Sequence, residues 1–321
     1  SPRRYFRVHS ISKDGFPIEH SLIGVLSPAT EKNTEFLHIR NLLSSHGIRV
    51  PAAYAADLKM GYLLLEDFGD TLLADKLLSR DAINPYYSSF SMLLQFANID
   101  TDRLALPFYN GTLLQEELDL FVHWFMKGLL DKPMADTEIK MLSSLSEFLI
   151  EEALSQPNIL THRDFHSRNL MYLPSGDLGV IDFQDAVIGP LTYDPVSLLK
   201  DCYTNWRREE QLDWLSLYLT RLRQHDEFCE LEMEDIVRWF DLMGLQRHLK
   251  VLGIFSRLCL RDGKPSYLHN LPKVIHYILE TLSIYAGTES TINCFGQWFN
   301  RRVLTELPDQ AWWLTSEEAN A

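Results

Sequence analysis

The N-terminal part of the chain alternates between short apolar runs and turn-forming residues. Two such runs, at 3–11 and 16–26, are separated by the sequence SKDG, which predicts an antiparallel hairpin. Apolar positions at helical spacing predict a helix over 33–47 that ends at a glycine. A second pair of strands is predicted at 51–59 and 61–68. Together these elements predict a small antiparallel sheet that carries one helix.

From about Asp70 onward, the apolar positions repeat mostly at helical spacing. One segment interrupts this pattern, because two short strands are predicted at 168–173 and 178–183, on either side of the turn sequence PSGD. The pattern therefore predicts an α+β fold in which a mostly helical C-terminal part contains a β-hairpin. The clearest helical segments are 86–99, 113–130 and 136–154.

The composition is that of a globular protein long enough for two domains, since 46% of its 321 residues are hydrophobic and 12% are aromatic. No apolar run approaches the roughly 18 residues that suggest a membrane-spanning helix. No signal-peptide pattern is visible either, so we expect no membrane partner. A formal net charge of -14 argues against non-specific binding of nucleic acid, which requires basic surface.

The four cysteines lie far apart and lack the close pairs that zinc sites and redox motifs require. Buried free thiols in a reducing compartment are the expected state, which predicts a cytoplasmic protein. The cysteines are Cys202, Cys229, Cys259 and Cys294.

The central hairpin carries the groups that phosphoryl transfer requires. This reaction needs a carboxylate to deprotonate the attacking hydroxyl and oxygen ligands for the magnesium ion that accompanies the triphosphate. Asp164 precedes the first strand, Asn169 lies at its start and Asp182 ends the second strand. Because a hairpin brings its two ends together, Asn169 and Asp182 are predicted to share Mg²⁺ while Asp164 faces the acceptor. Taken alone, Asp164 would be assigned to a turn or a helix cap.

The loop sequence resembles a known superfamily. HRDFHSRN followed by IDF is similar to the H-x-D-x-x-x-x-N and metal-binding aspartate motifs of the protein-kinase-like proteins. RRYFRV, GYLLLEDFG and VIDFQDAVIGPLTYDPVSLLKD, among other blocks, resemble the aminoglycoside-phosphotransferase-like branch. Within it they resemble the bacterial anomeric kinases of N-acetylmuramate and N-acetylglucosamine. The resemblance covers essentially the whole chain and implies use of ATP and Mg²⁺, with Asp164 as catalytic base and His162 bracing the loop.

The resemblance also implies a two-lobed, protein-kinase-like division of the chain. Residues 1–69 would form a nucleotide-binding N-terminal lobe that ends in a hinge, and residues 70–321 a larger helical lobe with the catalytic hairpin and the acceptor site. In such folds the hinge offers main-chain groups to adenine. This assigns Leu65, Glu66 and Asp67 to nucleotide binding, with an ordinary strand end as the alternative. We expect a monomer.

The chain departs from protein kinases in the part that holds the phosphates. It has no G-x-G-x-x-G loop, and the strand at 16–26 lacks the lysine that binds the phosphates in those enzymes. Lys13 lies in the turn before this strand, and Lys32 follows it. The first strand offers Arg3 and Arg7 on one face and Arg4 on the other. We assign Arg4 to nucleotide binding, and a solvated edge-strand charge is the alternative for each arginine.

Acceptor-binding residues are predicted beside the hairpin and on a helix before it. Gln184 and Asp185 follow Asp182, where they would hydrogen-bond a sugar hydroxyl or amide, with hydrogen bonds inside the loop as the alternative. Glu117 and Trp124 lie seven residues apart, which puts both on one face of a helix for hydrogen bonding and ring packing. Core packing is the alternative for Trp124.

Two residues of the C-terminal part complete the predicted site. Arg247 lies in a helical segment with several cations, and its bidentate geometry suits the lactyl carboxylate of a muramic acid. A solvated helix face is the alternative. Asp194 precedes a proline at a helix start, which predicts an N-cap that supports the hairpin structurally.

The predicted function is therefore transfer of the γ-phosphoryl group of ATP to the anomeric hydroxyl of N-acetylmuramate or N-acetylglucosamine in peptidoglycan recycling. The nearest alternative is a kinase of the same fold that acts on choline, an amino acid or an aminoglycoside. A nucleotide-binding pseudokinase is a further alternative because the strand lysine is missing. The presence of Asp164, Asn169 and Asp182 argues against it.

Overall fold

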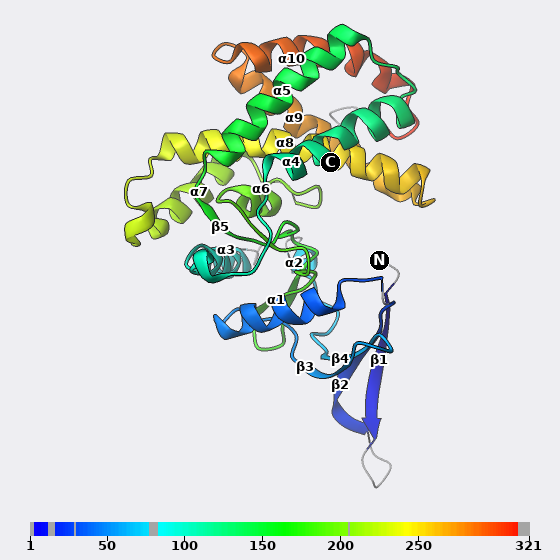
Figure 1. Cartoon of the computed structure of the whole chain (residues 1–321), viewed down its shortest axis with the longest axis vertical. Coiled ribbons are helices and arrows are strands. Elements are labelled where there is room, and N and C mark those ends of the chain that lie inside the picture. Colours follow the sequence, from blue (N-terminus) through cyan, green and yellow to red (C-terminus); the bar gives the residue numbers. More distant parts are fainter. Residues whose placement is uncertain (1–2, 12–16, 29, 77–82, 205, 314–321) are drawn as a thin grey trace. The chain divides into compact units, whose positions relative to one another are not determined.

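The computed structural model describes residues 3–11, 17–28, 30–76, 83–204 and 206–313 (Figure 1). The chain divides into two compact units. Unit 1 comprises residues 1–106 and 159–188, and unit 2 comprises residues 107–158 and 189–321. The central hairpin therefore belongs to the same unit as the N-terminal sheet, on the other side of the predicted boundary at residue 69. The predicted boundary separates a part that binds the nucleotide from a part that binds the acceptor, and this division stays a prediction.

Unit 1 is built on an antiparallel sheet whose strands lie in the order β1-β2-β4-β3 (Figure 1). Both predicted pairs of strands are confirmed, and the predicted turn SKDG lies outside the described residues. In the register of the sheet, Tyr5 is opposite Val25, which is opposite Leu63, so the three side chains share one face. The strands are β1 (Arg4–Ile11), β2 (Pro17–Leu26), β3 (Ala53–Asp57) and β4 (Tyr62–Glu66).

The helix α1 (Asn33–Ser45) follows the second strand and ends as the sequence predicts. Gly47 has a φ angle of 77° and donates its N–H to the carbonyl of Ser44 at 3.2 Å, while the N–H of Ile48 reaches the carbonyl of Leu43 at 3.0 Å. These two bonds and the buried Leu43 and Ile48 side chains form a Schellman motif, in which the left-handed residue is normally glycine. On the buried side of α1, Phe36 stacks on Phe183 with ring centroids 4.9 Å apart.

The rest of unit 1 contains the central hairpin and the loop that precedes it. β6 and β7 form the predicted antiparallel hairpin, in which Leu170 pairs with Val180 and Tyr172 with Leu178. The strands β5 and β8 pair beside it. These elements are α2 (Leu73–Lys76), α3 (Ile83–Ala97), η1 (Thr101–Arg103), β5 (Asn158–Thr161), β6 (Leu170–Tyr172), β7 (Leu178–Val180) and β8 (Val187–Pro190).

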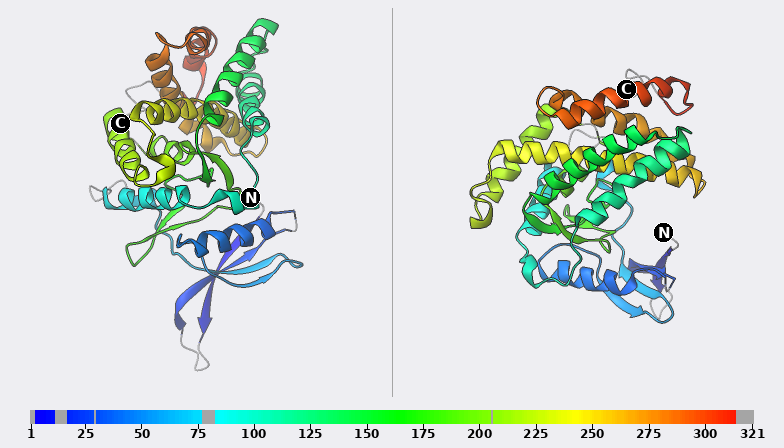
Figure 2. Two further views of the ribbon diagram at one scale, coloured as in Figure 1. Left: turned by 60° about the vertical axis from the view of Figure 1, so that its left-hand side comes forward. Right: turned by 45° about the horizontal axis from the view of Figure 1, so that its top comes forward.

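Unit 2 is helical, and the long helix α8 crosses several of the others (Figure 2). Leucine, isoleucine and aromatic side chains of α4, η2, α5, α8, α9 and α10 make one continuous core. The elements are α4 (Gly111–Leu120), η2 (Phe121–Leu129), α5 (Asp136–Leu154), α6 (Tyr193–Leu199), α7 (Arg208–Leu222), η3 (Asp226–Phe228), α8 (Met233–Leu260), η4 (Pro265–Asn270), α9 (Leu271–Tyr285), α10 (Ser290–Arg302) and η5 (Leu304–Asp309).

The segment predicted as one helix over 113–130 changes its winding at Phe121. The second half, η2, is a π-helix, whose i→i+5 pattern ends with the N–H of Leu130 bonded to the carbonyl of Phe125 at 3.0 Å. At the junction α8 comes very close, because a Cβ on Gly253 would overlap the main chain of Leu120. A glycine in the middle of α8 is therefore required by the approach of a second backbone.

None of the helices that the structure describes is both long enough and apolar enough to cross a membrane.

Candidate functional site

The hairpin brings Asn169 and Asp182 together, as predicted. Just beyond the last strand pair, the N–H of Ile181 donates to the main-chain carbonyl of Asn169 at 3.0 Å. Asp182 is the next residue and has a φ angle of 64°. Asp164 and Asn169 are half-buried and Asp182 is exposed, so solvent and ligands reach this end of the hairpin.

Hydrogen bonds inside the loop fix the position of Asp164 relative to Asn169. The main-chain carbonyl of Asp164 accepts the N–H of His166 at 3.0 Å and the side-chain Nδ2 of Asn169 at 2.9 Å. Since this bond uses the nitrogen of the Asn169 carboxamide, its oxygen Oδ1 is the atom that can bind a cation. The loop thereby presents a carboxylate and a carboxamide oxygen from positions five residues apart.

His162 links this loop to the second strand of the hairpin. The main-chain N–H of Asp164 donates to its Nδ1 at 3.2 Å, so Nε2 carries the proton and donates to the carbonyl of Ile181 at 3.1 Å. The ring is 1% exposed and packs near Phe96 and Phe165. Burial lowers the pKa of His162, an effect that Asp164 and Asp182 oppose. These contacts fit the predicted bracing role and leave the imidazole neutral.

Left-handed backbone marks the site in a way the sequence did not reveal. Among the described residues other than glycine, positive φ angles occur at Arg163, at Asp182 and at the more distant Asp131. Such conformations cost free energy in side-chain-bearing residues and are common at functional sites. Of the three, Arg163 directly precedes the predicted base Asp164, and Asp182 is itself a predicted metal ligand.

The residues present fit a magnesium ion. Asn169 Oδ1 and the Asp182 carboxylate are hard oxygen donors, and Gln184 Nε2 donates to Asp182 Oδ1 at 2.8 Å, which orients that carboxylate. The described residues contain no cluster of three or more histidine, cysteine, aspartate or glutamate side chains that would hold a metal ion. Magnesium is usually bound by one or two protein oxygens together with water and phosphate oxygens, and Asn169 and Asp182 offer two such protein oxygens.

Gln184 and Asp185, predicted to bind the acceptor, make contacts inside unit 1. Gln184 holds Asp182, as described. Asp185 Oδ1 accepts a hydrogen bond from the Nζ of Lys32 at 2.6 Å. Lys32 and Asp185 are 153 residues apart in the sequence, and no local pattern indicates that they meet. The acceptor role of both residues stays a prediction.

Two arginines of the first strand region are held by neighbouring side chains. Arg3 donates its Nε to Ser27 Oγ at 3.1 Å, lies 3.6 Å from Glu31 and has its guanidinium 5.6 Å from the centre of the Phe36 ring. Its side chain is 4% exposed. Arg7 binds both Asp67 and Asp70, at 2.5 and 2.7 Å. Its hydrogen bond is the main cause that lowers the pKa of Asp67 to about 2.

Arg4, which we assigned to nucleotide binding, lies on the other face of β1. Tyr5 lies two residues after Arg3 and shares its face of the strand. The guanidinium of Arg3 lies 5.6 Å from the centre of the Phe36 ring, and Phe36 stacks on Phe183, the residue after Asp182. The face of Arg3 and Tyr5 is therefore the one nearer the hairpin. Because side chains alternate along a strand, Arg4 points away from the hairpin. The structure does not bring Arg4 to the predicted metal ligands.

The predicted hinge residues continue from the end of β4. Leu65 is buried within the sheet, and Glu66 forms a bidentate ion pair with Arg49, which lowers the pKa of Glu66. After these residues, the ring of Phe68 lies against β7, where a Cβ on Gly179 would overlap it. Phe68 also packs with Met171 and Leu173, so it lies directly against the central hairpin. Adenine binding by the hinge stays a prediction.

Glu117, predicted to bind the acceptor, lies in a buried network of unit 2. Its carboxylate accepts from Lys250 Nζ at 2.9 Å, from the hydroxyl of Tyr109 and from Gln246 Nε2 at 3.4 Å. Lys250 also donates to the hydroxyl of Tyr193 at 2.8 Å. Lys250 balances the charge of Glu117 within unit 2. The contacts of Glu117 therefore do not support the predicted contact with a sugar.

The other predicted residues of unit 2 differ in their local structure from what the sequence indicates. Trp124 is half-buried, and it lies in the π-helix, so a seven-residue spacing no longer puts it on the face of Glu117. Arg247 is buried on α8. The N-cap of α6 is Thr192, so Asp194 is not the predicted N-cap. Asp194 is a buried residue of the first turn.

A second buried charge cluster in unit 2 was not predicted. The carboxylate of Asp241 binds Lys200 Nζ at 3.1 Å and receives two hydrogen bonds from Arg208, at 2.5 and 2.6 Å. His248 bonds to the carbonyl of Lys200 at 3.1 Å, and burial with the nearby Lys200 charge lowers its pKa to about 3. The residues come from three helices, and their spacing in the sequence gave no signal.

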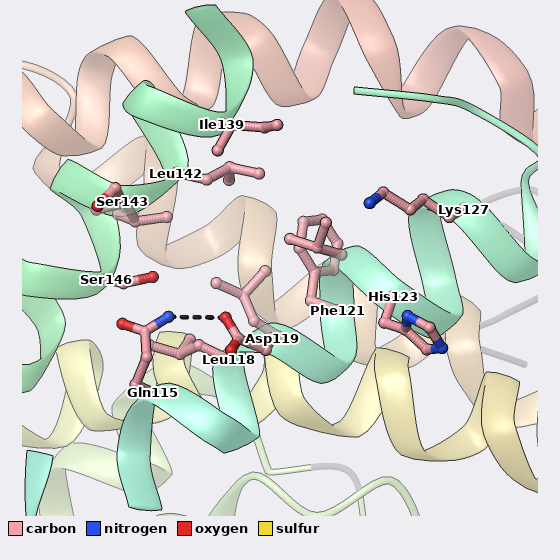
Figure 3. Close-up of a pocket in the computed structure, with 13 residues that line it drawn as sticks. Gln115, Leu118, Asp119, Phe121, His123, Lys127, Ile139, Leu142, Ser143 and Ser146 are labelled. Atoms are coloured by element: carbon pink, nitrogen blue, oxygen red, sulfur yellow. Dashed lines mark hydrogen bonds between the residues drawn. The ribbon is translucent and has the colours of Figure 1, made fainter. Parts of the chain in front are cut away.

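Unit 2 also contains a cavity of about 440 Å³ between α4, η2 and α5 (Figure 3). Gln115 donates to Asp119 at 2.8 Å on one side of it, and Lys127 lies on the other side. None of the residues predicted for the site is among those lining this cavity, which are Gln115, Leu118, Asp119, Phe121, Val122, His123, Lys127, Ile139, Leu142, Ser143, Leu145, Ser146 and Leu249.

Known proteins resemble this chain over most of its length. The model of a family described as the phosphotransferase enzyme family matches residues 25–231. An N-acetylmuramate/N-acetylglucosamine kinase of Pseudomonas putida is 38% identical over 281 residues, which span 87% of this chain and 80% of that protein. The protein of the same name from Pseudomonas aeruginosa is 35% identical over 277 residues, which span 86% and 79% of the two chains.

Solved structures share the fold at much lower sequence identity. The ADP-bound aminoglycoside phosphotransferase APH(2'')-Ib has a TM-score of 0.54 at 14% identity, over 86% of this chain and 93% of that one. The choline kinase LicA from Streptococcus pneumoniae also has a TM-score of 0.54, at 16% identity, over 81% and 86% of the two chains. The predicted α+β, kinase-like fold is thereby confirmed.

Proposed function

The chain belongs to the phosphotransferase enzyme family, and from this premise we propose that it transfers the γ-phosphoryl group of ATP to the anomeric hydroxyl of N-acetylmuramate or N-acetylglucosamine. The names of its relatives from two Pseudomonas species support this acceptor. The chain covers about four fifths of both relatives, at 80% and 79% of their lengths. The family match includes the whole catalytic hairpin.

The observation that carries the proposal is the geometry of the hairpin. One loop and two short strands bring Asp164, Asn169 and Asp182 to the same end, where ligands reach all three. The buried neutral His162 ties the loop to the second strand. This set supplies one base and two oxygen ligands, which is what phosphoryl transfer asks of a protein.

In the proposed reaction, Asp164 orients the anomeric hydroxyl and accepts its proton as the oxygen attacks the γ-phosphorus. The bond between the γ-phosphorus and the oxygen of the β-phosphate breaks, and ADP leaves. The Asn169 bond to the Asp164 carbonyl holds the main chain of Asp164 in place before substrate arrives, which limits the reorganisation that the loop needs. His162 is a positioning residue, because it touches the loop and β7 but no reacting atom. An anomeric hydroxyl is more acidic than an ordinary alcohol, which lessens the demand on the base.

Asn169 Oδ1 and the Asp182 carboxylate would hold Mg²⁺, which when bound neutralises charge on the triphosphate. Gln184 keeps the Asp182 carboxylate oriented for this purpose. We further propose that the hinge at residues 65–67 binds adenine through its main chain, that residues 1–69 carry the nucleotide and that the helical part reads the acceptor. A monomer in the cytoplasm completes the proposal.

The test is ADP release with Mg²⁺-ATP and a panel of acceptors, namely N-acetylmuramate, N-acetylglucosamine, choline, homoserine and an aminoglycoside. Phosphorus NMR then identifies the phosphorylated position. The methyl glycoside of N-acetylglucosamine is the matched control, because its anomeric oxygen is blocked while every other hydroxyl remains.

We expect an anomeric phosphate from both amino sugars and no turnover of the methyl glycoside. Phosphorylation of the methyl glycoside would contradict the anomeric position. Turnover of choline, homoserine or an aminoglycoside alone would show that this compound, and not an amino sugar, is the acceptor. Nucleotide binding with no turnover of any acceptor would favour a pseudokinase.

A further inference from the structure

The group that binds the nucleotide phosphates must lie close to the metal ligands of the hairpin. Kinases of this type use a lysine on a strand of the N-terminal sheet. In this chain none of the described strands β1, β2, β3 and β4 contains a lysine, so the sheet itself offers no ammonium group. A cation from another element has to replace it.

The arginines of β1 and its approach do not meet this requirement well. Arg3 is buried, with its guanidinium committed to Ser27, Asn33 and Glu31. Arg7 is held by two carboxylates, Asp67 and Asp70. Arg4 points to the opposite face of the sheet.

Lys32 meets it. It immediately precedes α1, and its Nζ lies 2.6 Å from Asp185 Oδ1, three residues after the metal ligand Asp182. The Lys32 side chain is 59% exposed and that of Asp185 38% exposed, so a ligand can reach the ammonium group. An ammonium group has three N–H donors, and the bond to Asp185 uses one of them.

We propose that Lys32 binds the nucleotide phosphates in place of the strand lysine, and that Asp185 positions its ammonium group beside the metal ligands. The inference rests on the proposed function, since it assumes a nucleotide at this hairpin. It gives Asp185 a role different from the predicted contact with a sugar. A lysine acts on phosphate as a point charge, so its entry from a helix start rather than a strand is chemically equivalent.

The first experiment measures binding of ADP, ATP and adenosine by calorimetry, with and without Mg²⁺ and without any acceptor. Lys32→Met should weaken binding of ADP and ATP by about 10- to 100-fold, the effect of losing a hydrogen bond to a charged group, and leave adenosine binding unchanged. Lys32→Arg should restore part of the loss. Lys59→Met, in the exposed turn between β3 and β4, is the matched control and should bind all three like the parent.

The second experiment separates phosphate binding from the ion pair itself. The double variant Lys32→Asp with Asp185→Lys restores opposite charges but moves the ammonium group to the loop. We expect its ADP binding to stay as weak as that of Lys32→Met. Recovery to the parental value would show that only the ion pair matters and would overturn the proposal.

Equal loss of adenosine and ADP binding in Lys32→Met would also overturn it, because the residue would then act on the fold or on adenine. These measurements need no acceptor, so they remain informative if the amino sugars prove to be the wrong substrates. Failure of the acceptor panel with Lys32-dependent ADP binding would refute the proposed acceptor and support the phosphate contact.

Discussion

Charged side chains in two regions of this molecule meet very different surroundings. In the catalytic hairpin of unit 1, Asp164 and Asn169 are half-buried and Asp182 is exposed. In the helical core of unit 2, Lys200 and Asp241 have side chains that are 0% exposed, and the Glu117–Lys250 pair is nearly as buried. The same chemical groups are thus open to ligands in one region and closed in by protein in the other.

The difference teaches where each kind of carboxylate contributes. A buried charge must be paired, because an unpaired one costs several kcal/mol, so Asp241 acts on the stability of unit 2. An exposed or half-exposed carboxylate has little effect on stability, but it can take a proton or a metal ion. We therefore expect substitutions in the hairpin to lower activity and those in the helical core to lower stability.

The largest effect is expected at Asp164. Asp164→Asn keeps the shape of the side chain and removes the base, so kcat should fall by about 100- to 10,000-fold, the usual contribution of a positioned base. The midpoint of thermal unfolding and the affinity for ADP should stay near those of the parent. Steady-state kinetics measure kcat, a melting curve measures the unfolding midpoint, and calorimetry measures the ADP affinity. A lower unfolding midpoint together with the lower kcat would contradict the idea that the hairpin carboxylates act on activity and not on stability.

The opposite outcome is expected for Asp241→Asn. This change removes the carboxylate that binds Arg208 and Lys200, and leaves Lys200 with the more distant carboxylate of Glu280 at 3.6 Å. Breaking a buried ion pair costs about 3–5 kcal/mol of unfolding free energy. Urea unfolding measures it. Glu306→Gln removes a partly exposed partner of Lys132 and is the control, with an expected cost of less than about 1 kcal/mol. Similar losses in both variants would contradict the role of burial.

The pH dependence of stability sharpens the same comparison at His248. Its pKa is about 3 in the folded chain, against 6.5 for the free side chain. Below pH 6.5 the unfolded chain therefore binds a proton that the folded chain does not, and stability falls as the pH falls towards 3. His248→Gln should flatten the urea-derived stability curve by about 2 kcal/mol between pH 6.5 and pH 5. An unchanged slope would mean that His248 accepts its proton at the ordinary pKa.

The smallest predicted effect concerns packing without charge. Gly253→Ala places a methyl group against the main chain of Leu120, and overpacking of this kind costs about 1–3 kcal/mol. Gly244→Ala on the same helix is the matched control, because its nearest neighbour would be 3.7 Å away, an ordinary contact. The control should gain up to about 1 kcal/mol from helix propensity. Equal stability of the two variants would show that α8 can shift away from Leu120.

Local patterns predicted the fold well where local bonds decide it. The turn-flanked apolar runs predicted the N-terminal sheet. Gly47 predicted the end of α1, because the Schellman motif there uses only bonds between neighbouring residues. The π-helix over 121–129 was not predictable in this way. Its apolar spacing resembles that of an α-helix, and the close approach of Gly253 is a contact between distant segments.

The same limit applies to the site. The placement of Asp164, Asn169 and Asp182 near one another could be predicted, because one hairpin and the loop before it carry all three. The pairing of Lys32 with Asp185 could not, since nothing local links two residues 153 positions apart. For Arg4 the alternation along the strand was correct, but the face nearer the hairpin became known only from the contacts of Arg3 with Phe36 and of Phe36 with Phe183.

The left-handed backbone of Asp182 has a consequence for how this sequence persists over generations. A φ angle of 64° is unfavourable for a side-chain-bearing residue and neutral for glycine. Mutation to glycine would therefore relieve strain while deleting the proposed metal ligand. Selection for stability alone would favour glycine at this position, so under the proposed function the aspartate trades stability for metal binding.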